Sequence, residues 1–266
     1  MCIRDRDWIS LAFVQAGICV CVPAFLLGAL LAEAMPIWPA IISGSLGYLI
    51  VVVGMVATGM IGCDLGLASC TCCQAGFGKS GARFIVSTIF AVNMIGWFGI
   101  QNGVCGEAFS NAMLAMTGWD IPVVVSNTIW GIIMLLTAVY GVHALEKLDK
   151  ISIPLLMIIM CYGTFLAFKV YGTGNLNDEG TVQSMSFMSG VALSFNFTAV
   201  GTITGPDYTR FQKSRKDTVK SVFYGVFPMG VITLIMGIVL TKLSGQYDIC
   251  LLYTSPSHET LRHLVC

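Results

Sequence analysis

Charged residues are scarce in this chain of 266 residues: only 11% are Asp, Glu, Lys or Arg, whereas soluble domains carry about 25%. Basic and acidic residues are equal in number, 14 of each, so no excess of positive charge points to a nucleic-acid partner. Hydrophobic residues make up 56% of the chain, and they form repeated apolar runs of about 20 residues, the length that crosses a bilayer. We therefore predict an all-α polytopic membrane protein whose partner is the lipid bilayer.

The chain also lacks the side-chain sets that catalysis or metal binding requires. No nucleophile stands beside a general base, and the central parts of the apolar runs contain no Lys, Arg, Asp, Glu or His. Cys70, Cys72 and Cys73 are clustered, but no His or acidic residue accompanies them at the spacing of a zinc site. We expect no enzyme, no metal site and no enzymatic cofactor. Amides, hydroxyls, aromatic rings and free backbone groups remain for binding, which favours a neutral polar substrate.

The apolar runs predict seven membrane spans, at about residues 8–32, 37–61, 84–109, 122–142, 151–171, 185–203 and 222–243. Lys and Arg gather in the loops after the second, fourth and sixth spans, and this bias predicts a cytoplasmic N-terminus. Both ends of the chain, MCIRDR and LLYTSPS, resemble translated sequencing-adapter sequence. We therefore interpret 1–7 and 247–266 as artefactual segments and 8–246 as the transmembrane domain.

Two of the predicted spans, the first and the sixth, carry helix-breaking residues. Pro23 lies within the first span, and the stretch Ser194–Phe211, SFNFTAVGTITGPDYTRF, interrupts the sixth with Gly, Thr and Pro. In lipid, irregular backbone is tolerated only where it is buried in protein or lines a cavity. In a five-helix repeat the first and sixth spans are counterparts, and interrupted counterparts point to a transporter site near the bilayer midplane.

The third span has a polar stripe formed by Asn93, Trp97 and Gln101, which are spaced by four residues and so share one helix face. An indole offers a flat surface and an amide offers donors and an acceptor, which suits a planar heterocycle. Interhelical hydrogen bonding explains the same stripe equally well, because polar residues of membrane helices often pair with one another.

The motifs GWFG at 96–99 and GTITGPDYTRF at 201–211, followed by a basic loop, resemble the nucleobase–cation symporter-1 family, and the bacterial cytosine permeases most of all. The resemblance implies an inverted-repeat transporter fold with broken first and sixth helices and twelve spans. About seven of the twelve would be present: the first five-helix repeat and two helices of the second. We expect that such a chain does not transport by itself, because the family's cation site also uses the eighth span.

The resemblance also implies roles for individual residues. Trp97 would stack on the substrate and Gln101 would hydrogen-bond to it. The cation would bind backbone carbonyls of Cys21 and Ala24. Further substrate contacts would come from the first and sixth spans, namely Phe25, Phe197, Thr198, Ala199 and Gly201.

The function that follows is import of a neutral pyrimidine-like nucleobase, with cytosine as the expected substrate, by symport with Na⁺ or H⁺ across a bacterial plasma membrane. We expect a multi-pass monomer. Allantoin, hydantoin, uracil, hydroxymethylpyrimidine and purines stay open as alternative substrates. A seven-span receptor or photosensor is the alternative from another class, although Lys220 and Lys242 flank the seventh span instead of lying within it, where a retinal-binding lysine is needed.

Overall fold

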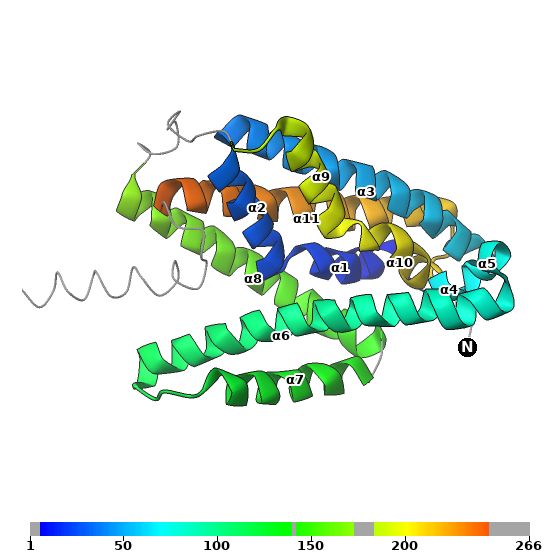
Figure 1. Ribbon diagram of the computed structural model, residues 1–266, viewed down its shortest axis with the longest axis horizontal. Coiled ribbons are helices and arrows are strands. Elements are labelled where there is room, and N and C mark those ends of the chain that lie inside the picture. Colours follow the sequence, from blue (N-terminus) through cyan, green and yellow to red (C-terminus); the bar gives the residue numbers. More distant parts are fainter. Residues whose placement is uncertain (1–5, 140–141, 173–183, 245–266) are drawn as a thin grey trace, which may run out of the picture.

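The computed structural model describes residues 6–139, 142–172 and 184–244, and within these ranges every regular element is a helix (Figure 1). The predicted all-α class is confirmed. The C-terminal segment 247–266 and most of the N-terminal segment lie outside the described residues. The helices are α1 (Trp8–Cys19), α2 (Val22–Ala34), α3 (Ile37–Leu65), α4 (Ser69–Cys72), α5 (Gln74–Gly81), the π-helix η1 (Ala82–Val86), α6 (Ser87–Thr117), α7 (Val123–Val139), α8 (Val142–Tyr171), α9 (Phe187–Thr198), α10 (Val200–Thr209) and α11 (Arg215–Ser244).

Within the described residues, five helical stretches are long and apolar enough to cross a membrane, and the bent pair of α1 and α2 is a sixth candidate span. Helix α7 is apolar but shorter, with 17 residues. These helices correspond in order to the seven predicted spans.

Charged segments extend the helices, and this corrects two of the predicted loops. The segment 143–150 was expected to be a loop but forms the first part of α8, where Lys150 Nζ lies 2.8 Å from Glu146 Oε1 across one helical turn. Likewise, α11 begins at Arg215 and not near residue 222. Pairs spaced by four residues stabilise a helix that projects into water, so the charged residues do not end it.

The predicted connector 62–83 is also largely helical. It contains the end of α3, both short helices α4 and α5, and the start of η1. Residues 74–117 then follow as a stretch of 44 residues that is helical except at Gly78, where a kink has φ 69° and ψ 171°. The loop was predicted from weak hydropathy, which by itself does not exclude a helix.

The first span breaks as predicted. Helices α1 and α2 meet at an angle of 51°, and Cys21 between them has an extended backbone with φ −147° and ψ 158°. Pro23 lies in the first turn of α2, where a missing N–H costs no helical hydrogen bond. Because Pro23 is four residues after Cys19, the Cys19 carbonyl has no helical N–H to accept.

The sixth span is less irregular than predicted. The stretch Ser194–Phe211 was expected to interrupt the helix, but the interruption is confined to Ala199, whose φ of −55° and ψ of −32° remain helical. Residues 187–209 count as one span. The hydroxyl groups of this stretch bond along the helix: Thr198 Oγ1 donates to the Ser194 carbonyl at 3.0 Å and Thr204 Oγ1 to the Val200 carbonyl at 3.1 Å.

The core bundle consists of α1, α2, α3, α9, α10 and α11, with α3 packed against α9, α10 and α11 (Figure 1). Hydroxyls tie α3 to the sixth span at three levels: Ser194 Oγ donates to Gly44 O at 2.7 Å, Thr58 Oγ1 to Thr202 O at 2.6 Å, and Thr209 Oγ1 to Gly59 O at 2.7 Å. The core bundle therefore fixes the position of the sixth span.

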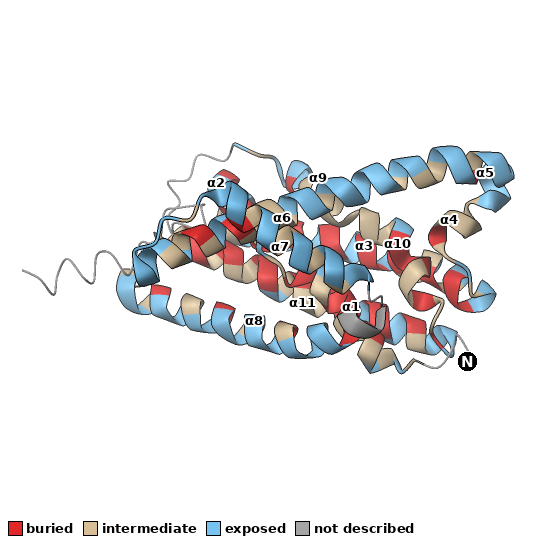
Figure 2. Cartoon of the chain, turned by 90° about the horizontal axis from the view of Figure 1, so that it is seen from below, coloured by how far each residue is buried: buried red, intermediate tan, exposed pale blue. Residues whose placement is uncertain are grey.

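Helices α6 and α7 form a hairpin outside the core bundle. Two hydroxyls hold the hairpin together: Ser126 Oγ donates to Gly106 O at 2.8 Å and Ser110 Oγ to Ile121 O at 2.6 Å. Figure 2 shows that α6, α7 and α8 are largely exposed, whereas buried residues gather in the core bundle. Large apolar side chains are exposed on all three helices, for example Ile95, Val124 and Ile158.

The crossing of α2 and α11 depends on glycine. A Cβ atom on Gly28 would collide with the Leu234 carbonyl oxygen, and one on Gly237 would collide with the Phe25 carbonyl oxygen. No side chain fits between the two backbones, so their close approach requires glycine on both helices.

Gly28→Ala should therefore destabilise the chain by about 1–3 kcal/mol, because the new methyl group meets backbone atoms that cannot move aside. The midpoint of unfolding in an SDS titration measures this. Gly103→Ala on α6 is the control: no atom lies within 4 Å of the added Cβ, so its midpoint should stay or rise. Equal midpoints for the two variants would contradict the packing argument.

Candidate functional site

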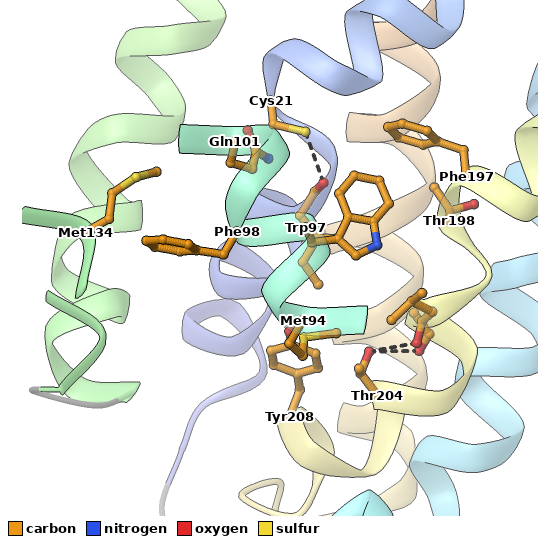
Figure 3. A pocket seen from close by; sticks show the side chains of 13 residues that line it. Cys21, Met94, Trp97, Phe98, Gln101, Met134, Phe197, Thr198, Thr204 and Tyr208 are labelled. Carbon is orange, nitrogen blue, oxygen red and sulfur yellow. Dashed lines mark hydrogen bonds between the residues drawn. The ribbon is translucent and has the colours of Figure 1, made fainter. Parts of the chain in front are cut away.

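A cavity of about 310 Å³ lies where the break in the first span meets α6 and the sixth span (Figure 3). Its walls come from five elements: the end of α1 and the following break, α6, α7, α9 and α10. The lining residues are Ile18, Cys21, Met94, Trp97, Phe98, Gln101, Met134, Phe197, Thr198, Val200, Gly201, Thr204 and Tyr208.

Trp97 forms one wall of the cavity and meets Phe197 edge to face. The two ring centroids are 5.2 Å apart and the ring planes are inclined by 86°. This arrangement lets the positive edge of one ring meet the negative face of the other. It links α6 of the hairpin to α9 of the core bundle and fixes the plane of the indole.

Gln101 and Cys21 both line the cavity and lie beside each other (Figure 3). The Cys21 thiol donates to the Ile18 carbonyl at 3.4 Å, and this bond holds the thiol against the last turn of α1. The Gln101 amide provides two donors and one acceptor one helical turn from the Trp97 ring, as the four-residue spacing predicts.

The remaining polar groups of the cavity are hydroxyls. The hydroxyl hydrogen atoms of Thr198 and Thr204 are used within the sixth span, so their oxygens are left as acceptors. None of the lining residues in the described part of the chain is Asp, Glu, Lys, Arg or His. The arrangement can bind a flat, uncharged ring by one face and hydrogen-bond to its edge.

Six of the residues expected to bind line this cavity together: Trp97, Gln101, Phe197, Thr198, Gly201 and Cys21. Three others do not: Ala24 is buried, Ala199 lies outside the lining, and Phe25 faces a second, apolar cavity of about 480 Å³. Asn93, the third residue of the predicted stripe, is exposed and lies outside the lining. Whether any of these residues binds a ligand stays a prediction.

The carbonyls expected to hold a cation differ in their availability. Cys21 O accepts from the N–H groups of Ala24 at 3.1 Å and Phe25 at 3.3 Å, whereas Cys19 O has lost its helical donor to Pro23. Among the described residues, no cluster of three His, Cys, Asp or Glu could hold a metal ion. A cation at this break would therefore depend on backbone oxygens, with those of the last turn of α1 more available than that of Cys21.

Sequence reasoning did not single out several lining residues. Met94 and Phe98 share the α6 face of Trp97 and Gln101, so helical periodicity could have found them. Met134 of α7 and Tyr208 of α10 reach the cavity only through tertiary packing. No local signal in the sequence identifies these two.

The family model described as permease for cytosine/purines, uracil, thiamine and allantoin matches residues 3–262. The cytosine permease of Escherichia coli (strain K12) is 26% identical over 245 residues, which cover 91% of this chain and 56% of that protein. The purine-uracil permease NCS1 of Arabidopsis thaliana is 25% identical over 251 residues, covering 84% of this chain and 41% of that protein. The chain thus spans about half the length of these relatives.

Among solved structures the chain is similar to Mhp1, a nucleobase-cation-symport-1 family transporter. The TM-score is 0.84 against its closed conformation with bromovinylhydantoin bound, at 18% identity and covering 94% of this chain and 58% of Mhp1. Against the inward-facing conformation the TM-score is 0.73. The chain has the inverted-repeat transporter fold that was expected, and it is closer to the closed form.

The contact between Trp97 and Phe197 can be tested by a double-mutant cycle with Trp97→Leu and Phe197→Leu. The edge-to-face pair should give a coupling free energy of about 0.5–1.5 kcal/mol in SDS unfolding. Phe98→Leu combined with Phe197→Leu is the control, because Phe98 lines the opposite side of the cavity (Figure 3). Equal coupling in the two cycles would argue against the contact.

Proposed function

Because this chain belongs to the permease family for cytosine/purines, uracil, thiamine and allantoin, we propose that it forms the substrate-binding part of a secondary active transporter. The transporter imports a neutral pyrimidine-like nucleobase, cytosine, together with Na⁺ or H⁺. Its relatives are permeases and not enzymes, and it is a multi-pass membrane protein.

The proposal rests on one observation: Trp97 and Gln101 line the same cavity, one helical turn apart on α6, and no charged side chain lines it with them. A nucleobase has two flat faces and an edge of alternating donors and acceptors. The indole can stack on a face, and the amide one turn away can accept from the exocyclic amine of cytosine while donating to its ring nitrogen or carbonyl oxygen. A volume of about 310 Å³ is at the lower end of small-molecule sites, which suits a single ring.

The absence of a lining charge bears on the class of substrate. A charged ligand in a low-dielectric site needs a partner charge to offset its desolvation, and none is present among the lining residues. A neutral heterocycle has no such need. The alternatives are other neutral rings of this kind, namely uracil, allantoin, hydantoin, hydroxymethylpyrimidine and purines, and the bound ligand of Mhp1 is itself a hydantoin.

The coupling cation is proposed to be Na⁺ or H⁺, with backbone carbonyls at the break in the first span as ligands. Broken helices of inverted-repeat transporters commonly offer such carbonyls to a cation. The Lys and Arg residues near the ends of the second, fourth and sixth spans support a cytoplasmic N-terminus in a bacterial plasma membrane. We propose a monomer. A seven-span receptor or photosensor is inconsistent with membership in a permease family.

Equilibrium binding of radiolabelled cytosine to the purified chain in detergent tests the proposal. Saturable binding that unlabelled cytosine displaces better than uracil, allantoin, hydantoin or hypoxanthine would support cytosine as the substrate. Preferential displacement by another of these rings would name that ring instead. Lack of saturable binding of any of them would refute a nucleobase site in this chain.

Trp97→Ala should weaken cytosine binding, because base–aromatic stacking contributes about 1–3 kcal/mol, or roughly 5- to 150-fold in Kd. The same binding assay measures the loss. Trp119→Ala is the matched control, since Trp119 is 71% exposed and lies outside the cavity. An unchanged Kd in Trp97→Ala would remove the stacking role.

Gln101→Ala should alter the preference among bases more than it alters affinity for any one of them, because the amide contacts the edge that distinguishes one base from another. Competition of each unlabelled base against labelled cytosine measures this preference. Thr128→Val serves as the control, since Thr128 lies outside the cavity lining and its hydroxyl donates to the Val124 carbonyl within α7. A competition profile identical to the wild type would count against Gln101 as the residue that reads the edge.

A further inference from the structure

The carboxylate of Asp149, in the first part of α8, faces the backbone of α1 at Gly17. A Cβ atom added to Gly17 would lie 3.3 Å from Asp149 Oδ1 and 3.5 Å from Oδ2. Both oxygens therefore occupy the space that a side chain at residue 17 would fill. The Asp149 side chain is half-buried, and α1 and α8 pack directly against each other at this level.

The cations that could neutralise Asp149 are directed to another carboxylate. Lys150 Nζ lies 2.8 Å from Glu146 Oε1, and Arg6 contacts the other oxygen of Glu146. In the described part of the chain Asp149 has no ion pair or hydrogen bond. An unpaired carboxylate against a helix backbone is costly unless a cation neutralises it.

Two of the described helices that pack against α8 carry no charged side chain. Helices α1 and α7 contain no Asp, Glu, Lys, Arg or His. The one titratable side chain of α1 is Cys19. Helix α11 contributes Leu240 and Leu243 to an apolar cluster with α8, and it carries Lys220, whose Nζ lies 5.8 Å from the centroid of the Trp8 ring at the start of α1. Helix α10 also contacts α1 and carries Asp207 and Tyr208.

Asp149 also lies between the cavity and the N-terminal end of the first span. Tyr208 lines the cavity, and Gly17 belongs to the last turn of α1, where the carbonyls carry the partial negative charge of a helix C-terminus. The Cys19 carbonyl two residues later has no helical donor. A cation leaving the break along α1 towards the expected cytoplasmic face would therefore meet the Asp149 carboxylate next.

We propose that Asp149 is a binding site for the coupling cation on the N-terminal side of the break in the first span. The ligand chemistry is a hard monovalent cation, Na⁺ or a proton, on an otherwise unpaired carboxylate. This inference rests on the proposed transport function and adds to it a side-chain ligand on α8, which the carbonyls of the broken span do not provide. Asp149 belongs to the first turn of the apolar stretch Glu146–Tyr171, which is long enough to cross a membrane, and acidic residues of membrane helices often mark ion pathways.

Thermal unfolding of the whole 266-residue chain in an uncharged detergent tests the proposal. The midpoint is followed by circular dichroism while Na⁺ replaces choline at constant ionic strength, and separately while the pH is lowered. A cation that binds only the folded chain raises the midpoint. We expect the wild type to respond to one of the two cations and Asp149→Asn to lose that response. Glu107→Gln, which alters an exposed carboxyl group on α6, should keep it.

Gly17→Ala provides a second variant that retains the carboxylate but displaces it, and it should weaken the response. Loss of the Na⁺ response in Asp149→Asn identifies Na⁺, and loss of the acid response identifies a proton. A full response in Asp149→Asn, or no response in the wild type, overturns the proposal. If Asp149→Asn does not elute as a folded species in gel filtration, an unchanged response in Gly17→Ala overturns it.

Cytosine binding by Asp149→Asn in choline medium separates this inference from the proposed function. The cavity is intact in that variant, so its affinity for cytosine should match that of the wild type measured without Na⁺. Loss of the cation response with retained cytosine binding supports both proposals, whereas a retained cation response refutes the cation site and leaves the nucleobase site standing.

Discussion

Inside a bilayer no water is available to hydrogen-bond backbone groups outside a helix. The break between α1 and α2 is the place in this chain where such groups occur. The extended Cys21 and the missing N–H of Pro23 leave the last carbonyls of α1 without helical donors. Such a break is stable only where protein surrounds it or a ligand completes it. The cavity and the Gln101 amide lie beside this interruption, and the Asp149 carboxylate faces the last turn of α1 that precedes it.

Much of this arrangement could be predicted because it depends on local rules. Apolar runs of bilayer length gave the spans, Pro23 gave the first break, and a spacing of four gave the shared face of Trp97 and Gln101. The errors have equally local causes. Cys21 lines both cavities, whereas Phe25 lines only the second one and Ala24 lines neither; successive residues on a helix differ by about 100° in direction, so neighbours in sequence seldom share a wall. Ala199 is separated from Thr198 in the same way.

The sixth span shows why composition alone overstates irregularity. Its glycines and threonines suggested unwound backbone, but threonine hydroxyls donate to carbonyls of the preceding turn and helix α3 receives others. Met134 and Tyr208 could not be predicted for a different reason. Their positions at the cavity depend on how α7 and α10 pack, and that is decided by contacts between residues far apart in the chain.

The cavity has one wall on the core bundle and another on the α6–α7 hairpin, and the hairpin makes few contacts with the bundle. A ring held between Trp97 and the sixth span would act as a removable cross-link between two otherwise weakly joined bodies. Sliding α6 by a single residue moves its side chains by about 1.5 Å along the helix axis, close to half the thickness of an aromatic ring. Binding of a ring therefore constrains the position of the hairpin relative to the core bundle. A thicker or thinner ligand would shift the hairpin.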